Sequence, residues 1–245
     1  MSTRPCLPYG MDVRTAEESG SDRAGKKSTP SISYHFSTGV LRQRPECEQQ
    51  QFGGSVANMK RKVDIENWIR KAHFQFFSKF EEPYYGVCVT MNCSAAYQFA
   101  KRNGLSFFLY CLHRSRSAAQ TIEPFKHRIE MGEVFLYDQI DAGSTIARSN
   151  GTFGYGHIIY CESLEEFLDG ANREVERVRS SSDLTRTTAD NIIRYSALPW
   201  IDFTSISHAR MFSIPDSCPR ISFGKMTESA GRRSMPVSIH VHHAF

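Results

Sequence analysis

The sequence is 245 residues long, which is enough chain to bury one sizeable hydrophobic core. Hydrophobic residues make up 40% of it and charged residues 23%, a balance that is ordinary for a soluble globular protein. The net charge of +4 comes without a dense run of Lys and Arg, so we predict no nucleic-acid partner. No apolar run approaches the ~20 residues of a membrane span, and the N-terminus lacks the apolar core of a secretory signal. We therefore expect a cytoplasmic protein that contacts no membrane.

The cysteine pattern favours the same compartment. The seven cysteines are odd in number, and no two of them have Cys-x-x-Cys spacing. The sequence therefore predicts neither a disulfide framework nor a zinc knuckle. Reduced thiols in a cytosol fit this pattern best.

Residues 1–58 differ in composition from the rest of the chain. They hold scattered charges, Ser, Gly and Gln, with no sustained apolar period. Such a stretch cannot bury enough surface to offset its conformational entropy. We expect a disordered extension over 1–58 and a single domain over 59–245, with Met1 and Met59 both open as the natural start.

A helical pattern begins behind a capping Asp64. Apolar residues recur there at three- and four-residue spacing, which predicts one amphipathic helix through Ile65, Trp68, Ile69, Phe76, Phe77 and Phe80. Residues 84–91 have the β-formers of a strand. Helices are expected next over 93–103, ending at Gly104, and from Ser106 to about Ala119.

Short strands dominate the second half of the chain, over 133–137, 144–148, 152–160, 192–197, 220–226 and 236–243. Ser163 and Glu166 form a capping box that opens a helix to about Arg179. Gly151, Gly154 and Gly156 lack the spacing of a phosphate loop, and we interpret them as glycines of a twisted strand. Helices interleaved with a majority of strands predict an α/β fold, a mixed β-sheet flanked by helices.

The last strand is rich in histidine, with His240, His242 and His243 before Phe245. On a strand, His240 and His242 point to one face and His243 points to the other. A metal site needs further ligands, and no Cys, Asp or Glu lies nearby in the sequence, so we predict no metal. By this pattern alone, each histidine also suits a place in the core.

Four segments together resemble the chloramphenicol acetyltransferases. They are Asp-Ile-Glu-Asn-Trp-Ile-Arg-Lys-Ala-His-Phe at 64–74, Tyr-Ser-Ala-Leu-Pro-Trp-Ile-Asp-Phe at 195–203, Pro-Arg-Ile-Ser-Phe-Gly-Lys at 219–225 and Val-Ser-Ile-His-Val-His-His-Ala at 237–244. They stand in the family's order and at about its separations, across almost everything from Val63 to Phe245. The resemblance implies the two-layer sandwich of the CoA-dependent acyltransferases and a homotrimer with active sites at the subunit interfaces.

The resemblance also implies an activity. The family moves the acetyl group of acetyl-CoA, a co-substrate and not a permanently bound cofactor, to a hydroxyl of chloramphenicol, and so confers antibiotic resistance. It assigns the general base to His243, and a histidine suits this role because its ordinary pKa lies near cellular pH. It assigns Ser196 as a hydrogen-bond donor to the oxyanion. Without the resemblance, Ser196 is better explained as a turn former at a strand end.

Further positions match by resemblance alone. Ser222 stands where the family has a threonine that orients the intermediate through water. Trp200 and Lys225 match contacts to coenzyme A, and Phe76, Phe77 and Phe153 match the pocket around the antibiotic's ring. Core packing explains the three phenylalanines nearly as well, because a pocket wall and a core look alike in sequence.

The family motif continues with an Asp-Gly pair whose Asp lies four residues after His243, whereas this sequence ends at Phe245. The family pairs that Asp with an arginine matching Arg70. We therefore expect a C-terminally incomplete chain in which Arg70 is buried and unpaired, at a cost of about 3–5 kcal/mol.

Two alternatives stay open. One is the catalytic core of a dihydrolipoamide acyltransferase, which shares the fold and the motif, and the other is an inactive truncated remnant. Residues 1–58 are too short and too patternless for the lipoyl and binding domains of the first alternative, and the Ser-Ala-Leu-Pro-Trp segment favours the antibiotic enzyme.

Overall fold

The computed structural model describes residues 59–245, so the extension expected over 1–58 lies outside the described residues. A seven-stranded sheet forms the centre, with strand order β2-β10-β8-β7-β5-β6 and β9 paired to β10. Strand β7 runs parallel to β5 and β8, and the other pairs are antiparallel. The strands are β2 (Tyr84–Asn92), β5 (Asp141–Ala147), β6 (Phe153–Ile158), β7 (Ile192–Ala197), β8 (Arg220–Phe223), β9 (Thr227–Ser229) and β10 (Arg232–His242). The mixed sheet is the one that the sequence predicts.

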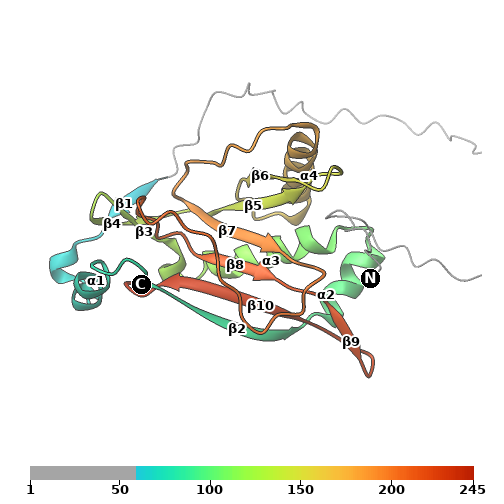
Figure 1. The fold of residues 1–245 in the computed structure, drawn as a ribbon, viewed down its shortest axis with the longest axis horizontal. Coiled ribbons are helices and arrows are strands. Elements are labelled where there is room, and N and C mark those ends of the chain that lie inside the picture. Colours follow the sequence, from blue (N-terminus) through green and yellow to red (C-terminus); the bar gives the residue numbers. More distant parts are fainter. Residues whose placement is uncertain (1–58) are drawn as a thin grey trace, which may run out of the picture. The chain divides into compact units, whose positions relative to one another are not determined.

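A smaller antiparallel sheet of three strands lies beside the first helix (Figure 1). Its strands are β1 (Lys60–Lys62), β4 (Glu133–Tyr137) and β3 (His127–Glu130). Of these, the sequence pattern predicts only β4. Strands β1 and β3 are short and rich in charged residues, so neither has an apolar alternation that could reveal it.

The helices are α1 (Lys71–Phe77), α2 (Ser94–Arg102), α3 (Phe107–Gln120) and α4 (Leu164–Ser180), with 3₁₀ turns at Ile65–Asn67 and Glu123–Lys126. Two N-caps confirm the sequence signals. The Ser106 hydroxyl accepts from the Leu109 N–H, and the Ser163 hydroxyl accepts from the Glu166 N–H. None of these helices is both long and apolar enough to span a membrane, as far as the described residues go.

The single helix expected from Asp64 to Phe80 is wrong. Asp64 does cap a helical turn, but that turn ends after Asn67, and Trp68 is extended with φ −81° and ψ 128°. This conformation lets the Trp68 ring pack against Phe74, His127 and Phe245. Burial of a large aromatic ring against three others outweighs the helical pattern.

The two faces of the central sheet differ in chemistry. One face is apolar and packs against the helices; its members include Ile193, Tyr195, Ile221, Phe223 and Val237. The residues that alternate with them are polar and point the other way. Figure 1 shows the long segment between β7 and β8 crossing this second face, with α3 behind the sheet. The active-site candidates Ser196 and Ser222 lie on the polar face.

Candidate active site

Two rows of polar side chains cross the polar face of β7, β8 and β10. In the first row, Ser196 pairs with Ser222 and Ser222 pairs with Ser238; in the second, Arg194 pairs with Arg220 and Arg220 pairs with His240. Paired residues on neighbouring strands point to the same side of a sheet. The fold therefore brings the predicted Ser196 and Ser222 together.

Ser222 is fully buried, and its hydroxyl has no hydrogen-bond partner among the described residues. A buried hydroxyl without a partner is uncommon, and it can accept or donate a hydrogen bond to a group outside the described residues, such as a bound ligand or water. Ser196 is half-buried and lines a cavity of about 220 Å³. Ser196 is thus placed to contact a molecule in this cavity, and Ser222 lies next to it on the neighbouring strand.

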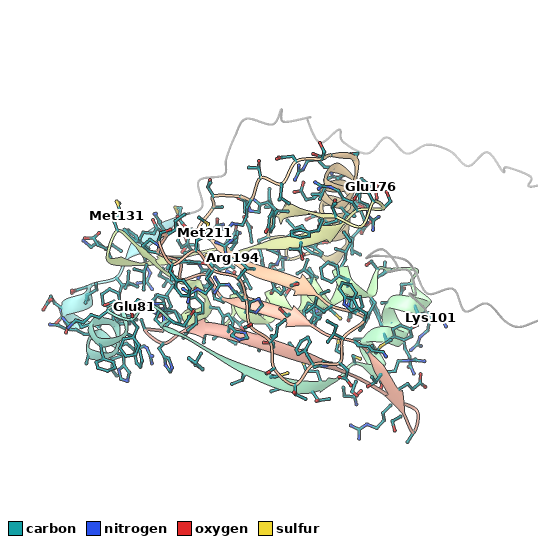
Figure 2. All side chains as sticks on the ribbon, in the orientation of Figure 1. Glu81, Lys101, Met131, Glu176, Arg194 and Met211 are labelled. Carbon is teal, nitrogen blue, oxygen red and sulfur yellow. The ribbon has the colours of Figure 1, made fainter. Side chains whose placement is uncertain are left out.

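The cavity is lined by parts of β5, β6, β7 and β8 and by two segments outside the sheet. Its polar lining includes Arg186, Arg194, Arg220, His208, Tyr155 and Thr145, and no Asp or Glu is part of it. Arg194 comes from β7, the strand that carries Ser196, and is labelled in Figure 2. The wall of this cavity is therefore positively charged.

One carboxylate behind the wall holds two of these arginines. The Asp216 Oδ2 atom lies 2.6 Å from Arg220 Nη2 and 3.5 Å from Arg194 Nε. Burial opposes the ionisation of Asp216, but the two arginines outweigh it and hold the pKa of the carboxyl below its ordinary value. A single Asp thus fixes two cations whose charges it only half neutralises.

Two histidines extend the site toward β2. The rings of His208 and His240 meet at right angles with centroids 4.8 Å apart, and the Ser238 hydroxyl lies 3.0 Å from His240 Nδ1. Burial lowers the pKa of His208 to about 4, helped by His240 and Arg220, and burial also lowers the pKa of His240. Both rings are therefore neutral near pH 7.

Gly86 makes room for the His240 ring. A Cβ at position 86 would overlap this ring, so we expect Gly86→Ala to displace His240 and to destabilise the protein by about 1–3 kcal/mol. Gly170→Ala is the matched control, because a Cβ there meets nothing closer than 4.0 Å inside α4 and should stabilise by about 0.5–1 kcal/mol. Urea unfolding at one protein concentration measures both changes. Equal stability of the two variants would show that the His240 ring is not held against β2.

The predicted base His243 lies elsewhere. Its ring stacks on Phe77 with centroids 4.3 Å apart and an angle of 9°, and it also contacts Tyr85 at 4.2 Å. Phe77 in turn contacts Phe76 at 5.1 Å. The structure therefore brings the predicted Phe76 and Phe77 to His243. They form an aromatic group next to the edge strand β2.

His242, which precedes His243 in the chain, is held by contacts of its own. It is buried, its Nδ1 accepts a hydrogen bond from the Ala244 N–H at 3.1 Å, and its ring contacts Tyr84. Burial lowers the pKa of His242 to about 4, and Arg210 and His243 add to this effect.

No cluster of three or more possible metal ligands occurs within residues 59–245.

The expectation that Arg70 is buried and unpaired is wrong. Its side chain is partly exposed, and it donates hydrogen bonds to the carbonyl oxygens of Ala244 at 3.0 Å and of His243 at 3.1 Å. Backbone carbonyls at a chain end are acceptors that a guanidinium can use without a carboxylate. Arg70 therefore anchors the segment that carries His243.

Within one chain, His243 does not reach Ser196. Val237, Ile239 and Val241 lie between the residues of the polar face on β10, and they pair with Val89, Val87 and Tyr85 of β2. His243 contacts Tyr85, so it belongs to the opposite face from Ser196. It also stands five residues beyond Ser238, roughly 16 Å along the strand direction.

The remaining predicted residues, Phe153, Trp200 and Lys225, lie away from His243. Phe153 opens β6 at the opposite edge of the sheet from β2 and contacts Tyr155, which lines the cavity, so it belongs with Ser196 and not with Phe76 and Phe77. The Lys225 N–H donates to the carbonyl of Ile201, next to Trp200, at 2.8 Å. The two residues predicted to contact coenzyme A thus lie together, beyond the C-terminal ends of β7 and β8.

Comparisons with known proteins bear on this arrangement. A family model described as chloramphenicol acetyltransferase matches residues 58–245. Chloramphenicol acetyltransferase 3 of Escherichia coli is 23% identical over 186 residues, which cover 75% of this chain and 87% of that protein. The chloramphenicol acetyltransferase of Proteus mirabilis is 25% identical, with 74% and 85% covered. A solved chloramphenicol acetyltransferase structure is 33% identical with a TM-score of 0.70, and 76% of this chain and 92% of that chain are covered.

The chain belongs to the chloramphenicol acetyltransferase family. The family and fold that the four sequence segments predict are thereby confirmed. The dihydrolipoamide acetyltransferase of Azotobacter vinelandii is also similar, at 15% identity and a TM-score of 0.51, with 71% of this chain and 78% of that chain covered. That likeness shows a shared acyltransferase fold and no more.

The arginines of the cavity wall were not predicted from the sequence of this chloramphenicol acetyltransferase family member. Arg194 stands two residues before Ser196, and Arg220 stands two residues before Ser222. Strand periodicity puts such pairs on one face, so this signal was available. For His208 and Asp216 no comparable signal exists, because they belong to the irregular segment between β7 and β8.

Proposed function

We propose that this chain is a chloramphenicol O-acetyltransferase that acts in the cytoplasm and confers resistance to the antibiotic. Its acetyl donor is acetyl-CoA, and no permanently bound cofactor takes part. Membership in the family supports both substrates. The neighbouring positions of Trp200 and Lys225 support a coenzyme A site, because an indole face and an ammonium group suit an adenine ring and a phosphate.

In this proposal, His243 removes the proton from the acceptor hydroxyl as the oxygen attacks the thioester carbon. The ring is held by Phe77 on one side and Tyr85 on the other, and this orients it without blocking its nitrogens. Ser196 donates a hydrogen bond to the oxyanion, and Ser222 beside it positions the intermediate. The carbon–sulfur bond then breaks, and His243 returns the proton to the thiolate of coenzyme A.

We infer the assembly of the protein from the separation of His243 and Ser196. One chain holds these groups on opposite faces of its sheet, so a working site needs two chains. We infer a homotrimer in which His243, Phe76 and Phe77 of one subunit meet Ser196, Ser222 and Phe153 of the next. Head-to-tail contacts of this kind close into rings.

The surface beside His243 supports such an interface. Strand β2 is an edge strand of the central sheet. Four large side chains on one face of this strand are between 43% and 50% exposed: Tyr85, Val87, Val89 and Met91. Long apolar edge strands are normally covered, since they otherwise promote aggregation.

Mixing two inactive variants tests the shared site. Ser196→Ala and His243→Ala each lack one half, so each homotrimer should keep about a hundredth or less of the wild-type turnover of chloramphenicol. When equal amounts are unfolded together and refolded, about one quarter of the interfaces combine both intact halves, and about that share of wild-type activity should return. Thiol release from acetyl-CoA measures the activity.

The matched control carries both substitutions in one chain and is mixed with an equal amount of either single variant. No interface in that mixture has both halves intact, so no activity should return. Light scattering should give three times the 27.9 kDa mass of the chain. A fully active monomer, or complementation that never exceeds the control, would overturn the shared site.

A further inference from the structure

The cavity beside Ser196 has a charge that a neutral acceptor does not need. Three arginines line it, Arg186, Arg194 and Arg220, and Asp216 is the carboxylate that pairs with two of them. Three positive charges against one negative charge leave an excess of two. Arg186 adds to this excess without compensation, since it makes no hydrogen bond or ion pair with the rest of residues 59–245.

Unused donors accompany the excess charge. The buried atom His208 Nε2 has no hydrogen-bond partner among the described residues, and Arg194 Nε has only its ion pair with Asp216 at 3.5 Å. Arg194 and His208 both line the cavity. Guanidinium groups match carboxylate and phosphate oxygens better than any other side chain because their N–H donors form a fixed fork. The cavity thus offers charge and unused donors to one anionic group.

The charged wall lies on the acceptor side of Ser196. Along β7, Arg194 precedes Ser196 by two residues, whereas Trp200 follows it by four and lies beside the Lys225 backbone. Donor and acceptor must approach the oxyanion from different sides. If Trp200 and Lys225 mark the donor side, the arginines face the acceptor and not coenzyme A.

We propose that this cavity binds a carboxylate or phosphate of the acyl acceptor, so that the enzyme acetylates anionic alcohols in preference to matched neutral ones. This inference rests on the acetyltransferase function proposed above and adds a substrate class to it. The acceptor hydroxyl oxygen bonds to the acetyl carbon as the carbon–sulfur bond breaks. Its proton passes through His243 to the thiolate, and the anion on the arginines takes no part in the chemistry.

Matched small acceptors test the preference. The probes are 4-(hydroxymethyl)benzoate, its neutral methyl ester and 4-(hydroxymethyl)phenyl phosphate, each with saturating acetyl-CoA, and chloramphenicol is assayed alongside. We expect kcat/KM for at least one anion to exceed that for the ester about 10-fold or more, the scale of a charge-assisted hydrogen bond. The two anions show which group the cavity prefers.

Charge reversal locates the effect. Arg186→Glu changes an exposed side chain and should bring the anion-to-ester ratio to about one or lower, and Arg186→Gln should give an intermediate ratio. Arg232→Glu makes the same charge change at the exposed first residue of β10, away from the cavity lining, and should keep the wild-type ratio. Calorimetry with each anion and no acetyl-CoA should show binding to the wild type that Arg186→Glu weakens.

The outcomes separate the two proposals. Turnover of chloramphenicol with no anion preference overturns the anionic acceptor and leaves the proposed function standing. Arg186→Glu could instead raise KM for acetyl-CoA and leave the anion-to-ester ratio unchanged. That result overturns the anionic acceptor and indicates that the cavity binds a phosphate of coenzyme A. Absence of all turnover contradicts the proposed function, and calorimetry then decides the anion site by itself: binding that Arg186→Glu weakens supports it, and no binding overturns it.

Discussion

Replacement of His243 by alanine is expected to lower kcat for acetyl transfer to chloramphenicol by about 10²–10⁴-fold, because this is the usual contribution of a general base. The alcohol has a high pKa and is a weak nucleophile unless a base removes its proton during attack. The fold should survive the change, since the ring is partly exposed between Phe77 and Tyr85. KM for both substrates should change little, since His243 acts mainly in the transition state.

Steady-state kinetics of thiol release measures this loss, with circular dichroism and light scattering to show that fold and assembly persist. His73→Ala is the matched control, because His73 is an exposed histidine on α1, the helix that carries Phe77. It should keep kcat within about twofold of the wild type, as expected for a surface change. Should His243→Ala keep more than about a tenth of the activity, the base is another group.

Replacement of Asp216 by asparagine is expected to destabilise the protein by about 3 kcal/mol, because it leaves the two arginines of the cavity wall without their counter-charge. Arg220 is buried, with 7% of its side chain exposed, whereas 21% of the Arg194 side chain is exposed. Solvent therefore compensates Arg194 in part, and the expected cost lies at the lower end for a broken buried pair. Urea unfolding at pH 7 measures it.

The effect of Asp216 should depend on pH in a defined direction. The folded state holds the pKa of Asp216 below the ordinary 3.8, so the carboxylate stabilises the fold at every pH above that ordinary value. This stabilisation is lost as the pH falls through the lowered pKa, where the folded protein also takes up the proton. The stability gap between wild type and Asp216→Asn should be constant from pH 7 to about pH 5 and should shrink below pH 4.

The control for this prediction is Asp202→Asn, an exposed aspartate on the same segment between β7 and β8. It should change stability by less than about 0.5 kcal/mol at either pH. A gap between wild type and Asp216→Asn that widens in acid would mean that Asp216 is protonated in the folded state at neutral pH. The charge assigned to the cavity wall would then be wrong.

Local signals in the sequence were enough for much of the fold. Ser106 and Ser163 predict helix starts because a serine hydroxyl accepts from a free backbone N–H at that position. Residues 192–197 are predicted as a strand, in which apolar and polar side chains alternate from Ile193 to Ala197, and the observed strand β7 has the same bounds. The helix expected through Trp68 failed, because the partners of that ring are Phe245 and His127, far away in the chain.

The sequence by itself determined the family, the mixed sheet and the short list that holds His243, Ser196 and Ser222, because motifs and strand periodicity are local properties. The tertiary structure decided which of these residues meet. Strand register sets Ser196 beside Ser222, and it puts His243 on the other face with Phe77. It also decided that Arg70 has backbone acceptors and that Arg194 and Arg220 share Asp216. Such contacts join residues far apart in the chain, and only the packed sheet fixes their distances.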